Sequence, residues 1–231
     1  FFGNVVLLPL WLQQYMGYTA TQAGMVLAPV GVMALVLSPV VGKSIGKVDP
    51  RYFATFAFLV FALVLWMRSG FNTQADIATI MIPTIIQGVA MAFFFIPLVT
   101  ITLSGLPPER IPAASGLSNF TRITAGAVGT SVATTLWESR AAMHHAHLVE
   151  SITLGNPIAS GALSGLASSG INAEQALAQV NRMVDQQAFM LAANDIFYMS
   201  AALFLLLIPL IWMTQPPQTS MGNADAAAGA H

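Results

Sequence analysis

The sequence predicts an all-α integral membrane protein, built as a bundle of six membrane-spanning helices. Charged residues make up 7% of the 231 residues and hydrophobic residues 56%, whereas soluble proteins average about 25% charged residues. The apolar residues are gathered in runs of about 20, the length of helix that crosses the hydrocarbon layer of a bilayer. A water-exposed surface of this composition would have too few charges to cover it, so lipid is the expected solvent.

Six apolar segments are long enough to be predicted as spans. Five of them lie within residues 1–137, at 1–18, 20–41, 52–67, 77–106 and 113–137. The sixth apolar segment covers 191–212, and we assign residues 191–214 to the sixth span. The chain begins with neither an initiator Met nor a basic signal-peptide start. We therefore expect the first segment to begin inside a helix of a longer protein.

Charges in the short loops predict the orientation of these spans. Lys43, Lys47 and Arg51 lie between the second and third segments, and positive charge in short loops marks the cytoplasmic face. This pattern places that loop, the 107–112 turn and the C-terminus inside the cell.

Two remaining regions follow from this orientation. Residues 138–190 lie outside and are predicted to form an extracytoplasmic helical hairpin or loop, with helical ends and a tip rich in Gly, Ser and Ala. Residues 215–231 are small and polar, and we expect them to form a disordered cytoplasmic tail.

Arg122 is the most informative single residue, because it lies about nine positions into the fifth predicted span. An arginine near the bilayer centre costs about 2.5–3.5 kcal/mol on insertion scales, so it should face the bundle interior or a wet cavity. At about 100° per residue, it shares one helix face with polar and small residues: Ser115, Asn119, Gly126, Gly129 and Ala133. Two interpretations remain open. Arg122 either lines a cavity, where it binds a substrate or a carboxylate from another part of a longer protein, or it is a structural residue whose guanidinium donates hydrogen bonds to neighbouring backbone carbonyls. The small residues favour close helix packing.

Two uncharged amides lie within the apolar segments. Gln87 is in the middle of the fourth segment, between Pro83 and Pro97, which predict kinks in that helix. Gln87 and Gln13 can each bind a ligand in a cavity or join two helices, and Gln13 can also mark the outer interface. Both are candidate substrate-pathway residues, together with Asn119 and Arg122.

Three clustered histidines raise a metal hypothesis. His144 and His147 share a helix face, and Glu150 follows beside them, but His145 points elsewhere. No second His or Cys cluster completes a coordination sphere, since the chain contains no cysteine. A solvated helix surface is the preferred interpretation, and we predict no metal site and no cofactor.

Other classes of function find little support in the sequence. The predicted spans contain no Ser/His/Asp constellation, no paired acids and no phosphate-cradling loop, so we expect no enzyme. The net charge of −1 lacks the excess of positive charge that is typical of nucleic-acid-binding proteins.

Four stretches of sequence carry a family resemblance. They comprise residues 8–13 (LPLWLQ) with 17–24, residues 38–42 (SPVVG) with 49–51, residues 101–110 (ITLSGLPPER) with 118–122, and residues 137–147 with the closing 229–231. The third stretch is the most specific. Together they resemble the EmrB-type drug:proton antiporters, the fourteen-span branch of the major facilitator superfamily, over nearly the whole chain.

The resemblance implies a six-span C-terminal helix bundle of a major-facilitator-type transporter. It implies proton-driven export of hydrophobic drug-like substrates by alternating access with an N-terminal half, in the lipid of the bacterial inner membrane. A periplasmic adaptor protein and an outer-membrane channel are the implied partners, with the outer hairpin as the adaptor contact. Within this hypothesis, Gly42, Gly46, Asp49 and Arg51 form an inner-loop gate.

Proton coupling needs an acid embedded in the membrane. None of the nine Asp and Glu residues lies deep within a predicted span, and only Glu138 and Asp195 lie at outer span ends. We therefore expect the coupling carboxylate in another part of the protein.

The alternative to a transporter is a membrane scaffold or receptor subunit that binds a partner through its outer hairpin. Arg122 argues against this alternative, because an anchor gains nothing from a charge in the membrane.

Overall fold

The computed structural model describes residues 1–45, 47–150 and 172–214, together with 152, 160, 161, 164, 165, 168 and 170. Every regular element in these residues is a helix: α1 (Phe2–Gln14), α2 (Ala20–Ser44), α3 (Pro50–Arg68), α4 (Ile77–Leu103), the short 3-10 helix η1 (Pro108–Arg110), α5 (Ile111–Glu150) and α7 (Ala173–Trp212). Each of the six segments predicted as spans overlaps one of these helices, and the all-helical structure confirms the all-α membrane class.

Four helices are long and apolar enough to cross a membrane, namely α2, α3, α4 and the Glu174–Trp212 part of α7. Helix α1 has only 13 residues, fewer than the about 20 that a span needs. Helix α5 has 40 residues but is less apolar, because Gly, Ser and Thr recur along it. Two of the six predicted spans therefore do not qualify by length and composition alone.

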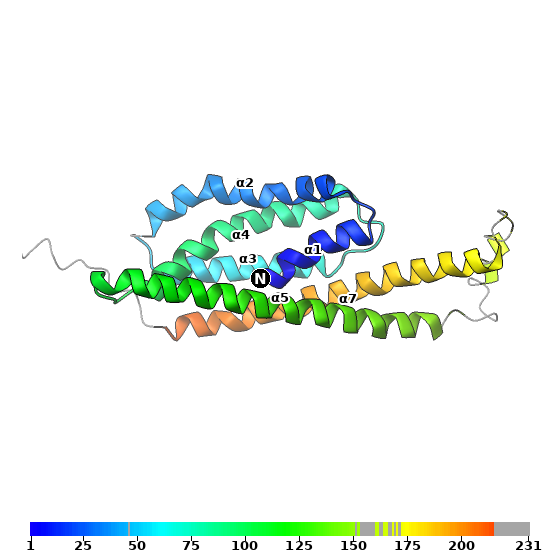
Figure 1. Cartoon of the computed structure of the whole chain (residues 1–231). Coiled ribbons are helices and arrows are strands. Elements are labelled where there is room, and N and C mark those ends of the chain that lie inside the picture. The colour runs from blue at the N-terminus through cyan, green and yellow to red at the C-terminus, as the bar shows by residue number, and fades with distance from the viewer. Residues whose placement is uncertain are drawn as a thin grey trace, which may run out of the picture.

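Helices α5 and α7 form a long antiparallel pair that extends beyond the group of α1 to α4 at one end (Figure 1). Residues 138–150 continue α5, and residues 173–190 form the first half of α7. We call the end at which α5 and α7 extend beyond the other helices the outer end, and the opposite end the inner end. These names follow the orientation that the loop charges predict. Gly46, residues 215–231 and most of the predicted hairpin tip lie outside the described residues.

Local hydrogen bonds begin several helices. Thr19 and Gln22 form a capping box at α2, and Asn172 accepts a hydrogen bond from the backbone N–H of Gln175 at α7. Asp76 caps α4 by accepting hydrogen bonds from the hydroxyl and the backbone N–H of Thr79, which lower the pKa of its carboxyl. These side chains satisfy N–H groups that have no partner within the first turn.

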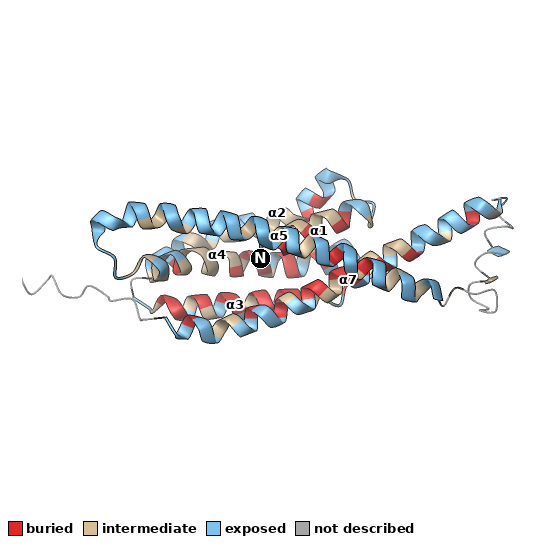
Figure 2. Ribbon diagram, turned by 60° about the horizontal axis from the view of Figure 1, so that its bottom comes forward, coloured by how far each residue is buried: buried red, intermediate tan, exposed pale blue. Residues whose placement is uncertain are grey.

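The buried core lies where α1, α3, α4 and α7 meet. Phe61 stacks on Phe204 with ring centroids 5.2 Å apart, and Phe58 meets the same ring edge-on at 5.5 Å. Figure 2 shows that α5 is exposed along most of its inner half. Its buried residues are Trp137 and Ala141, both on the stretch beyond that half. The core therefore leaves the inner half of α5 outside it.

Helices α2 and α4 approach each other closely at Gly88. A Cβ atom placed on Gly88 would lie 2.6 Å from the Met33 Cβ and 2.9 Å from the Val30 carbonyl oxygen. The second contact is with backbone, which cannot turn away as a flexible side chain can. Gly88 thus permits a backbone approach of the kind that small residues allow between membrane helices.

Substitution of Gly88 by Ala is expected to lower the free energy of unfolding by about 1–3 kcal/mol, the usual effect of overpacking. The matched control is Gly31→Ala on α2, where an added Cβ meets nothing within 4 Å. Thermal unfolding of both variants in detergent measures the difference. Equal melting temperatures would contradict the close approach.

Candidate functional site

A cavity of about 720 Å³ lies among α1, α4, α5 and α7. Its walls are mostly aromatic and aliphatic, and they include Phe1, Phe2, Phe94, Phe95, Leu98, Val99, Leu136, Ile196 and Leu203. Small residues on α5 complete one wall, among them Gly126, Gly129 and Ala133. A volume of this size suits a drug-sized molecule, for which pockets of about 300–1,000 Å³ are usual.

Arg122 is the one charged residue among those that line the cavity. Its guanidinium donates a hydrogen bond to the Asn119 Oδ1 at 2.6 Å. Its Cζ lies 5.5 Å from the centre of the Phe95 ring on α4, within the range of a cation–π interaction. The sequence prediction placed Arg122 and Asn119 on one helix face, and the structure joins them by this hydrogen bond, although only Arg122 lines the cavity and both residues are exposed.

The small residues beside Arg122 pack closely against α1. A Cβ on Gly126 would lie 2.7 Å from the Phe2 ring, and a Cβ on Gly3 would lie 2.5 Å from the Ala133 Cβ. The same Gly3 position approaches the Gly129 carbonyl oxygen to 3.3 Å. This geometry agrees with the close packing that the spacing favoured.

The other two candidate pathway residues lie away from the cavity. Gln87 is 6% exposed, and its Oε1 accepts a hydrogen bond of 2.6 Å from Arg68. The Gln13 side chain donates to the backbone carbonyl of Pro9 at 3.2 Å and remains exposed. Neither lines the cavity, so Gln87 joins two helices and Gln13 bonds within its own helix.

Arg68 is a buried residue whose role the sequence did not reveal. Its position at the end of α3 suggested a loop charge, but only 1% of it is exposed. Besides Gln87, it faces the Thr84 hydroxyl at 3.4 Å, and its Nε has no partner among the described residues. This guanidinium joins the outer end of α3 to the middle of α4.

Asn4 is a further polar residue of the cavity wall that sequence reasoning missed. It is 6% exposed, and its Nδ2 donates to the Ser200 hydroxyl on α7 at 3.0 Å. Its Oδ1 has no partner among the described residues. The available signal was an amide within the first apolar segment, but only packing shows where it points.

The inner-loop residues are engaged within this bundle. Asp49 accepts a hydrogen bond of 2.9 Å from the Arg51 backbone N–H and so caps α3. The Arg51 guanidinium donates to the Thr214 carbonyl just beyond the end of α7. Gly42 is exposed within the last turn of α2. Their proposed gate role stays a prediction, and Gly46 lies outside the described residues.

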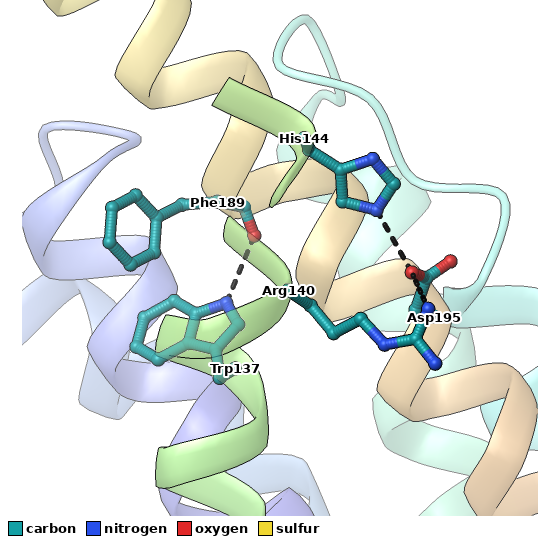
Figure 3. Close-up of polar contacts among 5 residues, drawn as sticks. All are labelled: Trp137, Arg140, His144, Phe189 and Asp195. Atoms are coloured by element: carbon teal, nitrogen blue, oxygen red, sulfur yellow. Dashed lines mark hydrogen bonds and ion pairs between the residues drawn. The ribbon is translucent and has the colours of Figure 1, made fainter. Parts of the chain in front are cut away.

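A set of polar contacts joins α5 and α7 at the outer end (Figure 3). The Trp137 Nε1 donates to the Phe189 carbonyl at 2.9 Å. The His144 Nε2 lies 2.9 Å from the Asp195 Oδ2, and the Arg140 Nη1 lies 3.7 Å from the same oxygen. The two histidines expected on a solvated surface, His144 and His145, therefore lie partly buried between the helices.

His145 makes a second contact of this kind. Its Nε2 lies 3.3 Å from the Asp185 Oδ1 and 3.2 Å from the Asn181 Oδ1, whereas His147 is exposed. Among the described residues no group of three or more His, Cys, Asp or Glu side chains could hold a metal ion.

Comparison with known proteins agrees with the all-helical membrane fold. Residues 1–130 match the family model of the Major Facilitator Superfamily, and the chain belongs to this superfamily. It is 46% identical to the multidrug export protein EmrB of Escherichia coli K12 over 232 residues, all of this chain and 45% of that protein. It is 41% identical to the fatty acid resistance protein FarB of Neisseria gonorrhoeae, over 96% of this chain and 44% of that protein.

These relatives confirm the predicted resemblance to EmrB-type transporters, and the chain spans about 45% of the length of each of these two curated relatives. A more distant relative, the lincomycin resistance protein LmrB of Listeria innocua, is 29% identical over 58% of the chain and 28% of its own length. The apolar helices and these relatives identify a multi-pass protein of the inner membrane.

Substitution of Trp137 by Phe is expected to lower the free energy of unfolding by about 1 kcal/mol or more, because it removes the hydrogen bond to the Phe189 carbonyl and replaces a buried indole with a smaller ring. Trp66→Phe is the matched control, since 62% of Trp66 is exposed. Chemical or thermal unfolding in detergent compares the two. An equal loss in both variants would show that the Trp137 hydrogen bond contributes nothing.

Proposed function

We propose that this chain is the C-terminal half of a proton-driven exporter of hydrophobic compounds, which works by alternating access with an N-terminal half. The cavity supports this proposal most directly, because it is large, apolar and aromatic and contains one guanidinium. The names of the relatives, which describe multidrug export and fatty acid resistance, support the same class of substrate.

The exposed face of α5 supports a missing partner half. Leu117 and Phe120 are each 67% exposed and Ile123 is 59% exposed, on the same stretch of α5 as Arg122. The N-terminal half would cover this part of α5 and close the cavity. Transporters of this superfamily have two related halves, and alternating access is largely a rocking of one half against the other around a site near the bilayer midplane.

Arg122 is the residue we assign to substrate or to the other half. Asn119 and Phe95 hold its guanidinium at the cavity wall, where it can attract a negatively charged group on a hydrophobic substrate or on the N-terminal half. Asn4 and Ser200 add polar groups on the opposite wall. Few polar groups in an apolar cavity allow many substrates of different shape to bind.

The outer ends of α5 and α7 are the proposed contact for a periplasmic adaptor protein, which would lead to an outer-membrane channel. They extend beyond the rest of the bundle (Figure 1), and the contacts between His145, Asp185 and Asn181 bind them together. The same outer ends favour the alternative, a scaffold or receptor subunit. The scaffold leaves the cavity and its charged residue without a role, and so we prefer the exporter.

Export of a lipophilic fluorescent substrate by the full-length protein in proteoliposomes, under an imposed pH gradient, tests this function. Arg122→Gln removes a charged partner worth about 1.5–3 kcal/mol, so substrate-dependent export should fall about tenfold or more. Arg110→Gln is the matched control, because Arg110 is exposed and does not line the cavity.

Two other results would contradict the proposal. Export that is equal in both variants would leave Arg122 without a functional role. An absence of gradient-driven movement in the wild type, for several substrates, would favour the scaffold.

A further inference from the structure

A second pocket continues the cavity toward the outer end. It has a volume of about 310 Å³ and is lined by Ser69, Arg140, Asn194, Asp195, Tyr198 and Met199. Met199 lines both pockets, and Asp195 directly precedes Ile196 of the cavity wall. We call this second space the outer pocket. A carboxylate therefore lines a pocket that shares Met199 with the cavity, whose own described lining contains none.

The carboxylate of Asp195 has two basic partners on α5. His144 and Arg140 approach the same oxygen, Oδ2, at 2.9 Å and 3.7 Å. The side chains of His144, Asp195 and Arg140 are 20%, 36% and 42% exposed, so the cluster is accessible to water. It lies between two helices that each also contribute to the cavity wall.

We propose that His144 and Asp195, together with Arg140, form the site at which protons from the outer side bind during export. This inference rests on the proposed proton-driven function and names the residues that receive the proton. It places a proton-binding carboxylate in this chain, whereas the absence of acids deep within the predicted spans led us to expect the coupling carboxylate elsewhere in the protein. Imidazole is the side chain whose charge ordinarily changes between pH 5 and 8, and its range is therefore suited to an acidic exterior. The exchange forms and breaks only an N–H or O–H bond at the His144 Nε2 or the Asp195 Oδ2.

Proton binding changes the contacts of the whole cluster. With His144 neutral, Arg140 and Asp195 balance each other and the cluster has no net charge. One added proton gives it a charge of +1, and His144 then competes with Arg140 for the same carboxylate oxygen. Because both bases are on α5 and the acid is on α7, this competition shifts one helix relative to the other at the rim of the cavity.

The other ionisable groups near this joint have partners of their own. On the same two helices, His145 and Asp185 contact each other, and Glu138 and Asp185 both lie near Tyr15, which follows α1. Tyr198 of α7 lines the outer pocket itself.

The loop between α3 and α4 also packs here, through the hydrogen bond from Asn194 to the Phe71 carbonyl. Of the charged groups at the ends of this loop, Arg68 faces Gln87 and Asp76 faces Thr79. His144 is therefore the ionisable base closest to the Asp195 carboxylate in the part of the chain that the structure describes.

Two transport assays on the full-length protein in proteoliposomes test this site. The first measures export of a lipophilic fluorescent substrate under a pH gradient, and the second measures exchange of the same substrate without a gradient. We expect Asp195→Asn to lose gradient-driven export and to keep gradient-free exchange, because it removes the proton site and leaves the cavity intact. We expect His144→Gln to change the dependence of export on external pH.

Matched controls are available on the same helices. Asp185→Asn removes an α7 carboxylate that also contacts a histidine of α5 but lines neither pocket. His147→Gln removes an exposed histidine close to His144. Both controls should behave as the wild type in the two assays.

Each other result overturns the inference in a recognisable way. Gradient-driven export that survives in Asp195→Asn, with a proton-driven wild type, refutes this site and leaves the proposed function intact. Loss of exchange as well as export in Asp195→Asn shows that the residue maintains the fold or the cavity, which also refutes the site. A wild type that exchanges substrate but ignores the gradient refutes the proposed proton drive, and this site with it.

Discussion

A charged guanidinium in a membrane protein needs polar or aromatic partners, and Arg122 of α5 sets this requirement for the cavity wall. Arg122 lies in the inner half of α5, where lipid would not solvate it, and an unsatisfied charge at the bilayer centre costs several kcal/mol. The structure meets this requirement with one amide, Asn119, and one aromatic face, Phe95, at the wall of a cavity. Arg122 itself is exposed in this chain, at the wall of the cavity that we propose as the substrate path.

The same requirement explains why α5 differs from the other helices. Gly126 of α5 and Gly3 of α1 allow these two helices to approach each other closely. The small residues along α5 also lower its apolar character below that of an ordinary span. Close packing between membrane helices relies on such residues, because lipid provides no hydrophobic force to bring helices together. Beyond Trp137 the contacts of α5 change, and hydrogen bonds and ion pairs to α7 replace small-residue packing.

Helix α5 therefore connects two regions with different chemistry. Its inner half forms a wall of the cavity, and its outer half forms a polar joint with α7 that includes Asp195. Residues 196–203 of α7 contribute to the cavity as well. A change in the angle between α5 and α7 at the outer joint alters the cavity directly, since both helices continue into its walls without a break.

The sequence predicted those features that depend on local pattern. Runs of apolar residues located the helices, and the spacing of Asn119 and Arg122 placed them on one face, because both follow from the period of a single helix. Such patterns do not reveal contacts between distant helices. The bond between Asn4 and Ser200, 196 positions apart, is an example, and so is the pairing of His144 with Asp195.

Gln87 is a second example of a contact that the sequence pattern does not reveal. An amide in the middle of an apolar helix was compatible with a ligand or with a second helix, and only the position of Arg68 decides for the second helix. The position of Arg68 at a helix end does not show whether its long side chain turns inward, and the structure buries it. The packing of α3 on α4 provides that information.

The proposed exporter function requires the cavity beside Arg122 to be a water-accessible path for hydrophobic substrates. This chain contains no cysteine, so single cysteines can be introduced and labelled with a membrane-impermeant thiol reagent in the full-length protein. Ser118 lines the cavity, whereas Leu206 of α7 is 72% exposed and lies outside it. We expect the Ser118→Cys variant to react with the thiol reagent and a hydrophobic substrate to slow this reaction. We expect no reaction of the Leu206→Cys variant. Equal labelling of the two variants, unaffected by substrate, would contradict it.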